Sequence, residues 1–222
     1  MEYGFQIAFE AAWDAYKSGS SPIGVSILNA RGEVLAVGRN QVHTPAEGGN
    51  TIAMHQLAHA EANAILQISE ETVPNMHPDI RSYTLYTILE PCPFCFGAIV
   101  MGSIRHVKFA ARDKLGGAAA LNNSLDYIKN KKITVEGPFP QLEIIQVALA
   151  TCFELESIAN PNKRKYSGDL ARLLRRSVDL WRTYCPDGTR IGEQMYKDGI
   201  LKQLAAENKN FLTVKDYVNS AC

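Results

Sequence analysis

The sequence has the composition of an ordinary folded protein. It contains 222 residues, of which 46% are hydrophobic and 21% are charged, and this length allows one domain with an appendage or two small domains. Lysine and arginine together number 23, the same as aspartate and glutamate, so the formal net charge is zero. This balance excludes a strong overall positive field for holding nucleic acid, although it allows a local basic patch.

Neither export nor insertion into a membrane is predicted. The N-terminal stretch "MEYGFQIAFEAAWDAYKSG" contains acidic residues and has apolar residues at helical spacing, unlike the apolar segment of a signal peptide. The longest apolar runs are far shorter than the ~20 residues that a membrane helix needs. The chain has five cysteines, and an odd number without an export signal favours reduced thiols. We therefore expect a cytoplasmic protein with no membrane partner.

Apolar periodicity predicts helices and strands that alternate along the chain, which indicates an α/β fold: a three-layer α/β/α sandwich with a five-stranded mixed sheet. Residues 41–56 are rich in Thr, Pro, Gly and Asn and are predicted to form a loop. The predicted strands are residues 23–28, 33–38, 82–88, 104–111 and 132–137, and the predicted helices are an N-terminal helix ending at Gly19 and residues 57–68, 93–101, 121–130 and 142–158.

The C-terminal part is predicted to be a helical extension. The stretch "NPNKRKYSG" at residues 160–168 looks like a linker, which divides a domain of residues 1–160 from an extension of residues 161–222. Basic residues gather between Lys163 and Arg176, and a solvated helix face is a simpler explanation for them than a surface for RNA. The extension is a candidate cover for the active site, oligomer interface or docking element.

One imidazole and two thiols have the spacing of a zinc site. Cys92 and Cys95 form a C-x-x-C at the predicted start of a helix, which places both sulfur atoms on one side of its first turn, and His59 supplies a nitrogen ligand. A catalytic zinc site has three protein ligands and leaves the fourth position open. His55 lies one turn before His59 and is the candidate fourth ligand of a closed, structural site. Zinc itself is an inference, since iron accepts the same ligands.

Glu61 is the candidate proton carrier of this site. It lies two residues after His59, so on a helix it points in another direction and is not predicted to be a ligand. Near the start of the helix it is able to reach a water bound to zinc. Zinc lowers the pKa of such a water towards ~7, and a carboxylate then moves its proton. This arrangement suits hydrolysis at a carbon that bears an amine.

The two motifs together resemble the zinc deaminase signature H-x-E…P-C-x-x-C. The segments "HAE" and "PCPFC", with "SPIGVSIL", Asn40 and "VKFAARD", are similar to the cytidine deaminase-like superfamily, and most similar to its guanine deaminase and tRNA adenosine deaminase branch. The resemblance runs from about Phe5 to Ile158. It implies a hydrolytic deaminase with one Zn²⁺ per chain, and relatives of this fold usually pair, so a homodimer is expected.

The resemblance also implies roles for single residues. His59, Cys92 and Cys95 would hold zinc, and Glu61 would carry the proton from water to the ring nitrogen and then to the leaving amine. Asn40 would hydrogen-bond the base, although taken alone it is typical of a turn. The backbone N–H groups of Ala60 and Cys92 would contact the substrate or the oxygen on zinc.

Three neighbouring residues have simpler explanations. Glu90 either orients the cysteine helix or caps it. Phe94 and Phe96 flank Cys95, and packing in the core is the expectation for both, although one of them is a candidate for bordering the pocket.

The sequence departs from the family in two places, so its substrate is left open. The loop between Asn40 and His59 looks longer than in the relatives, and the residues beyond 160 are unmatched by compact members. A small-molecule base or nucleoside is the favoured substrate. The first alternative is adenosine-to-inosine editing of tRNA, supported by "ARD" followed by small residues and by basic residues such as Lys131. The second is a non-catalytic subunit that contains zinc, against which the presence of Glu61 argues.

Overall fold

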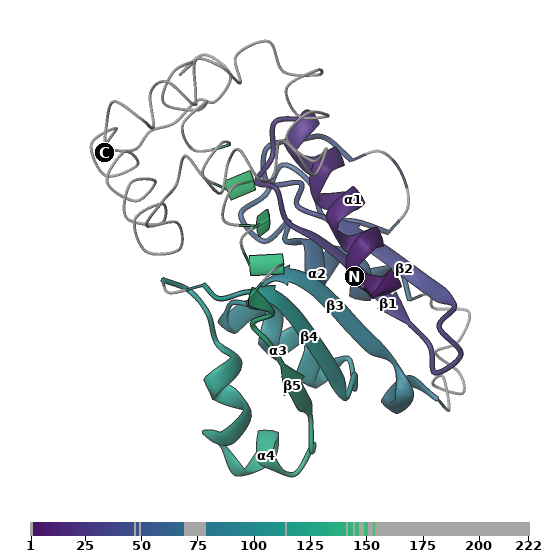
Figure 1. Cartoon of the computed structure of the whole chain (residues 1–222), viewed down its shortest axis with the longest axis vertical. Coiled ribbons are helices and arrows are strands. Elements are labelled where there is room, and N and C mark those ends of the chain that lie inside the picture. The colour runs from purple at the N-terminus through teal and green to yellow at the C-terminus, as the bar shows by residue number, and fades with distance from the viewer. Residues whose placement is uncertain are drawn as a thin grey trace. The chain divides into compact units, whose positions relative to one another are not determined.

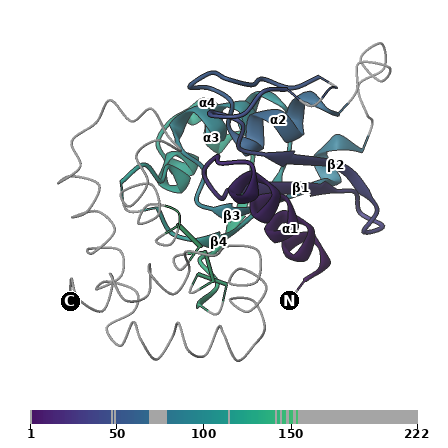
Figure 2. The same cartoon turned by 90° about the horizontal axis from the view of Figure 1, so that it is seen from above.

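The computed structural model of the chain (Figures 1 and 2) describes residues 2–46, 48, 50–68, 79–113, 115–140, 142–143, 145–146, 149–150 and 153. The first of its two compact units spans Met1–Glu143 and contains the strands that the structure describes and the predicted metal ligands. The predicted linker and the extension of residues 161–222 lie outside the described residues, so the predicted boundary at residue 160 stays a prediction. The described residues between 142 and 153 are helical, where the sequence predicts the helix 142–158.

The unit is built around a five-stranded mixed sheet, as the sequence predicts. The strands lie in the order β2-β1-β3-β4-β5. The strand β1 pairs antiparallel with β2 and β3, whereas β3 pairs parallel with β4 and β4 pairs parallel with β5. The five strands are β1 at Gly24–Leu28, β2 at Val34–Arg39, β3 at Thr84–Leu89, β4 at His106–Ala111 and β5 at Thr134–Glu136.

Helices cover both faces of the sheet and complete the predicted three-layer sandwich. In Figure 2 the helix α1 lies on one side of the strands, and α2, α3 and α4 lie on the other. Each face has its own apolar core: Phe5 and Ile88 belong to the cluster under α1, whereas Leu85 and Ile99 belong to the cluster under α2 and α3. The helices are α1 at Tyr3–Lys17, α2 at Ala60–Leu66, α3 at Pro93–Met101 and α4 at Asp126–Lys129.

Two glycines let helices approach β1 and β2 closely. A Cβ on Gly24 would lie 2.1 Å from the carbonyl oxygen of Ala8 in α1, and a Cβ on Gly38 would lie 2.1 Å from the carbonyl oxygen of Ala60 in α2. Any side chain at either position would therefore push a helix away. The contact at Gly38 brings the first turn of α2 directly onto β2.

Most observed elements are shorter than predicted; the strands predicted over 104–111 and 132–137, for example, begin at His106 and Thr134. Three further differences involve turns. The helix predicted over 57–68 begins at Ala60, because His59 is extended and Leu57 and Ala58 form a turn in which the Ala58 N–H donates to His55 O at 2.9 Å. The strand predicted over 82–88 begins at Thr84, after a 3₁₀ turn at Ile80–Ser82. The helix predicted over 121–130 is divided into a 3₁₀ turn at Ala119–Asn123 and α4.

Within the described part of the chain, no helix has the length and apolarity needed to cross a membrane.

Candidate active site

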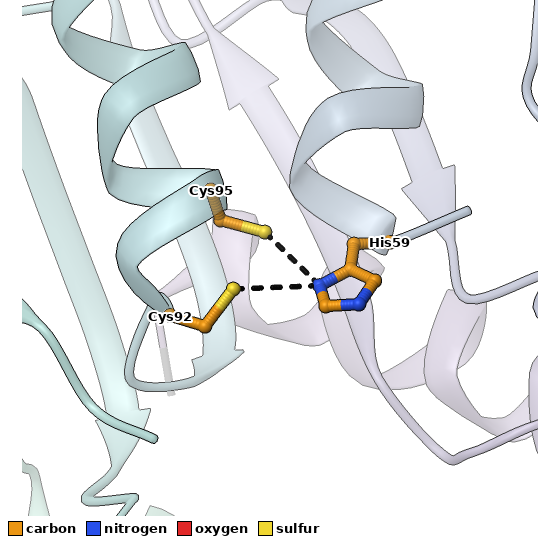
Figure 3. A group of neighbouring side chains, drawn as sticks. All are labelled: His59, Cys92 and Cys95. Carbon is orange, nitrogen blue, oxygen red and sulfur yellow. Dashed lines mark hydrogen bonds between the residues drawn. The ribbon is translucent and has the colours of Figure 1, made fainter. Parts of the chain in front are cut away.

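The predicted ligands lie where two helices begin side by side. His59 is the residue before α2, Cys92 is the residue before α3, and Cys95 lies in the first turn of α3 (Figure 3). The local sequence explains the start of α3, because Pro93 at the first helical position lacks the N–H that would have no partner there. The chain reaches this point directly from the end of β3, a place where parallel sheets commonly carry their sites.

The three ligand atoms have the spacing that zinc requires. The Nδ1 atom of His59 lies 3.5 Å from Cys92 Sγ and 3.3 Å from Cys95 Sγ, and all three atoms lie within 4.8 Å of one another. With Zn–S near 2.3 Å and Zn–N near 2.0 Å, a tetrahedral site separates its nitrogen and sulfur ligands by about 3.5 Å. The donor set therefore fits zinc, with Nδ1 rather than Nε2 of His59 as the nitrogen.

The electrostatics of the two thiols favour a bound cation. The hydrogen bond with the Cys95 thiol, together with His59 beside it, lowers the pKa of Cys92 to about 4. The same bond and burial raise the pKa of Cys95. A metal ion is bound by thiolates, so metal binding would displace any proton that the two sulfur atoms hold. The hydrogen bond to Cys92 also raises the pKa of His59.

No fourth protein ligand joins the group in the described residues. The cluster of groups able to hold a metal there consists of His59, Cys92 and Cys95. His55, the candidate for closing the site, instead accepts a hydrogen bond at its Nδ1 atom from the Leu57 N–H at 3.0 Å. The geometry is that of an open site, which leaves room for water.

Glu61 lies beside the metal ligands with its carboxylate buried. The residue is 4% exposed, and burial raises the pKa of its carboxyl. Its Oε2 atom accepts a hydrogen bond from Cys95 Sγ at 3.1 Å, which places one oxygen directly against the cluster. A buried carboxylate is costly unless it is held by hydrogen bonds, so its partners are part of the site.

Thr87 is one such partner, and sequence analysis missed it. Its Oγ1 atom lies 3.1 Å from Glu61 Oε1 and 3.0 Å from the carbonyl oxygen of Leu89, and the residue is fully buried. Alternation along β3 points Thr87 towards the α2 side of the sheet. A hydroxyl at an otherwise apolar position of a buried strand was the available signal.

Asn40 lies just beyond β2 and is also buried, with 4% of its surface exposed. Its Oδ1 atom accepts hydrogen bonds from Ser20 Oγ at 2.6 Å and from the Val42 N–H at 3.2 Å. Ser20 is a second residue that sequence analysis missed, because nothing in the pattern at the end of α1 connects it with Asn40.

The long loop between Asn40 and His59 is anchored to α2. Asn63 is fully buried; its Oδ1 atom accepts the Ile52 N–H at 2.8 Å, and its Nδ2 atom donates to Ile52 O at 3.0 Å and to Gln41 Oε1 at 3.3 Å. The side chain therefore bonds both polar groups of one loop residue, as a neighbouring strand would. These bonds tie the loop to α2 at Ile52.

Phe96 and Phe94 differ in burial, and Glu90 bonds a segment outside α3. Phe96 is a core residue, 1% exposed, as expected, whereas Phe94 is 38% exposed and its ring meets the edge of the His59 ring with centroids 5.8 Å apart. Phe94 therefore borders the site. Glu90 does not cap α3; its carboxylate accepts the backbone N–H groups of Asp113 and Ala119, at 3.3 and 3.1 Å. It ties the segment 113–119 to the end of β3.

The two predicted backbone donors occupy helix starts. Ala60 is the first residue of α2 and Cys92 immediately precedes α3, and the first N–H groups of a helix have no partner within it. Both therefore lie where an amide is available to a bound molecule.

Comparison with known proteins gives a family and several relatives. Residues 1–111 match the family described as the cytidine and deoxycytidylate deaminase zinc-binding region. A tRNA-specific adenosine deaminase of Bacillus subtilis (strain 168) is 34% identical over 112 residues, which are 50% of this chain and 62% of that enzyme. A cytosine deaminase of Candida albicans is 24% identical over 153 residues, which are 68% of this chain and 83% of that enzyme.

These matches cover only part of some relatives. The chain spans less than two thirds of the Bacillus enzyme, and it spans 17% of a tRNA(Ile)-lysidine synthase of Deinococcus radiodurans, to which it is 33% identical over 111 residues. Among solved structures, a guanine deaminase from Nitrosomonas europaea superimposes with a TM-score of 0.51 over 68% of this chain and 82% of that one, at 20% identity. At this identity the likeness concerns the fold.

Proposed function

The chain belongs to the cytidine and deoxycytidylate deaminase family, whose members bind zinc, and from this premise we propose that it removes an exocyclic amine as ammonia from a small nucleobase, nucleoside or related heterocycle. The observation that carries the proposal is Glu61, a buried carboxylate with Oε2 3.1 Å from Cys95 Sγ. A metal that only stabilised the fold would not need this carboxylate beside its open position. The neutral net charge supports a small substrate.

His59, Cys92 and Cys95 would hold the zinc ion, and Glu61 would carry the proton. Zinc, when bound to such ligands, lowers the pKa of water towards ~7 and so supplies a nucleophile at neutral pH. Glu61 takes one proton from the attacking water and delivers it to the ring nitrogen next to the aminated carbon. It then carries the second proton to the departing amine, so that water is consumed, the ring gains a carbonyl oxygen, and ammonia is released.

The remaining residues would hold the base in place. Asn40 would hydrogen-bond the ring, and the N–H groups of Ala60 and Cys92 would contact the substrate from the two helix starts. Phe94, against the His59 ring, would exclude water from one side. Orientation of the ring against a fixed nucleophile is a large part of the rate enhancement in such reactions.

Ammonia release from a panel of free bases, nucleosides and mononucleotides tests the proposal, with the Glu61→Ala variant as the blank. Turnover of one compound by the zinc-loaded chain, absent in the variant at equal zinc content, is the expected result. Equal turnover by both proteins would remove Glu61 from the mechanism. If the wild-type chain released no ammonia from any compound of the panel, the proposal for small substrates would be contradicted.

A second candidate is editing of adenosine to inosine in tRNA, which is favoured by the identity to the tRNA-specific adenosine deaminase of Bacillus subtilis. An enzyme of this kind needs a positive track for phosphates, and the basic residues between Lys163 and Arg176 lie outside the described residues. Inosine formation on tRNA, falling steeply between about 50 and 200 mM salt, would favour this candidate. Deamination of a free base should hardly respond to salt.

The homodimer and the cytoplasmic location belong to the same proposal. The helix α3 leaves an apolar face uncovered in the described unit, with Phe94 38% and Met101 71% exposed and Tyr127 adding a hydroxyl 3.7 Å from Met101 Sδ. A second copy would bury this face. A dimer seen by light scattering that dissociates in Met101→Glu supports the pairing, and a monomeric wild-type chain contradicts it.

Zinc ligation requires Cys92 and Cys95 to be reduced, and this requirement supports a cytoplasmic location.

A further inference from the structure

We propose that Ser20 is a positioning residue that holds the side-chain amide of Asn40 in one orientation, with its Nδ2 atom presented to the base as a hydrogen-bond donor. The inference rests on the proposed function, because it assigns a direction to the contact between Asn40 and the substrate. The residue that the inference adds to the site is Ser20, which lies in the turn after α1. The Ser20 hydroxyl donates a hydrogen bond to Asn40 Oδ1 and is not bonded to a metal ligand.

Both partners are held by their own backbone. The Ser20 N–H donates to Ala15 O at 2.9 Å, in the turn that ends α1, and the Asn40 N–H donates to Ile23 O at 3.0 Å, at the edge of the sheet. The distance of 2.6 Å between Ser20 Oγ and Asn40 Oδ1 is short for a hydrogen bond between neutral groups. Since Ser20 is fully buried, its hydroxyl does not exchange this partner for bulk water.

The surrounding donors decide which end of the Asn40 amide faces Ser20. A backbone N–H only donates, so the atom 3.2 Å from the Val42 N–H must be the oxygen Oδ1. The His43 N–H in turn donates to Ser20 Oγ at 3.3 Å, and the Ser20 hydroxyl donates its own hydrogen bond to Asn40 Oδ1. This chain of bonds runs in one direction, and each bond polarises the next.

The other end of the amide is then left for a ligand. With Oδ1 bonded twice, Nδ2 points away from Ser20 and Val42, and it makes no hydrogen bond to any residue that the structure describes. Nδ2 is not one of the buried, unpartnered polar atoms of the described residues, so it reaches the 4% of Asn40 that is exposed. A ring nitrogen or carbonyl oxygen of the substrate would satisfy it, and the amide would not have to be reoriented on binding.

Replacing Ser20 by alanine should weaken substrate binding without slowing the chemistry. The variant removes one of the two bonds to Oδ1 and leaves Glu61, Cys92 and Cys95 untouched. Loss of one such bond is expected to raise KM roughly 3- to 10-fold, with kcat and zinc content unchanged. Asn40→Asp gives the complementary result, because its carboxylate still accepts from Ser20 and Val42 but has no donor for the base, so KM should rise further.

Ser26→Ala is the matched control. Ser26 is also a fully buried serine, on β1, and its hydroxyl donates to Gly4 O at 2.7 Å. Its loss should lower stability about as much as the loss of the Ser20 hydroxyl, with KM unchanged. In the Asn40→Ala background, Ser20→Ala should add nothing to KM, because its effect passes through Asn40. A KM that rises equally in both serine variants, or an additive effect in the double variant, would overturn the proposal.

A second measurement separates this inference from the proposed function. The side-chain Nδ2H₂ resonances of Asn40, assigned by their loss in Asn40→Ala, should shift in Ser20→Ala and stay in place in Ser26→Ala. If the wild-type chain deaminates nothing, the proposed function fails, and the resonances still report whether Ser20 orients Asn40. Unchanged resonances in Ser20→Ala contradict the positioning role whatever the substrate.

Discussion

Two halves of the candidate site are constructed in different ways. The metal half consists of His59, Cys92, Cys95 and Glu61, which lie at or near the starts of two adjacent helices. The base half consists of Asn40, Ser20 and the loop 41–56 anchored by Asn63. In the metal half, short spacings at each helix start hold His59 near Glu61 and Cys92 near Cys95, and the two adjacent helix starts bring these pairs together across 33 residues of sequence. In the base half, hydrogen bonds between residues 11 and 20 positions apart in the sequence connect the groups.

The difference predicts separable effects. In the proposed function, groups of the metal half would touch the reacting atoms, so changes there should lower kcat. Groups of the base half would orient and enclose the ring, so changes there should raise KM. Single substitutions in each half, and one outside both, test this division.

The largest effect is expected from Glu61→Gln, in the metal half. The amide keeps the size of the side chain but carries no proton between water and leaving group, so kcat should fall about 100- to 10,000-fold. Steady-state ammonia release gives kcat, and metal analysis should still find one zinc per chain. Glu10→Gln, an exposed acid on α1, should behave as the wild type. A kcat within threefold of the wild type would disprove the assignment.

Asn63→Ala tests the base half, because it releases the anchored loop. The variant leaves the N–H and C=O groups of Ile52 without their partner, and the expected loss is about 1–3 kcal/mol of unfolding free energy, together with a raised KM. Urea unfolding and substrate titration measure the two effects. Asn122→Ala removes a comparable bond, 2.8 Å long to Ile133 O, and should destabilise the fold without altering KM. A normal KM in Asn63→Ala would show that the loop is not part of the binding wall.

Thr87→Val should affect the metal half mildly. Valine preserves the shape but removes the hydroxyl that holds Glu61 Oε1 at 3.1 Å, so kcat should fall roughly 3- to 10-fold with KM unchanged. Thr84→Val, on the same strand but partly exposed, serves as the control. A rise in KM instead of a fall in kcat would place Thr87 in the base half and break the division.

The smallest effect is expected from Lys108→Gln, outside both halves. Lys108 Nζ lies 3.1 Å from Glu2 Oε2 and 3.5 Å from Glu136 Oε2, and these two carboxylate side chains are 45% and 56% exposed. Solvent screens such pairs, so the unfolding free energy should change by less than about 1 kcal/mol, and kcat and KM should not change. A loss above about 2 kcal/mol in urea unfolding is more than a screened pair supplies. Such a loss would show that solvent exposure does not limit the strength of these contacts.

Much of the fold was predictable because it depends on periodic patterns. The alternation of helices and strands, the five-stranded mixed sheet and the start of α3 at the C-x-x-C all follow from local spacing. Element boundaries were less accurate where a turn intervened, as at Leu57 and Ala58 before α2. The apolar composition around Phe94 predicted a core residue, although the helix turns that ring towards His59.

The sequence by itself determined the order of the elements and the two local pairs of the metal half, His59 with Glu61 and Cys92 with Cys95, because one turn of helix or one alternation along a strand leaves a regular spacing of residue types. Only the tertiary structure decided which polar groups meet across the chain: Ser20 with Asn40, Thr87 with Glu61, and Glu90 with the segment 113–119. A hydrogen bond between distant segments imposes no spacing on either, since any buried donor near any acceptor satisfies it. Such partners become visible only when the sheet and its helices are folded.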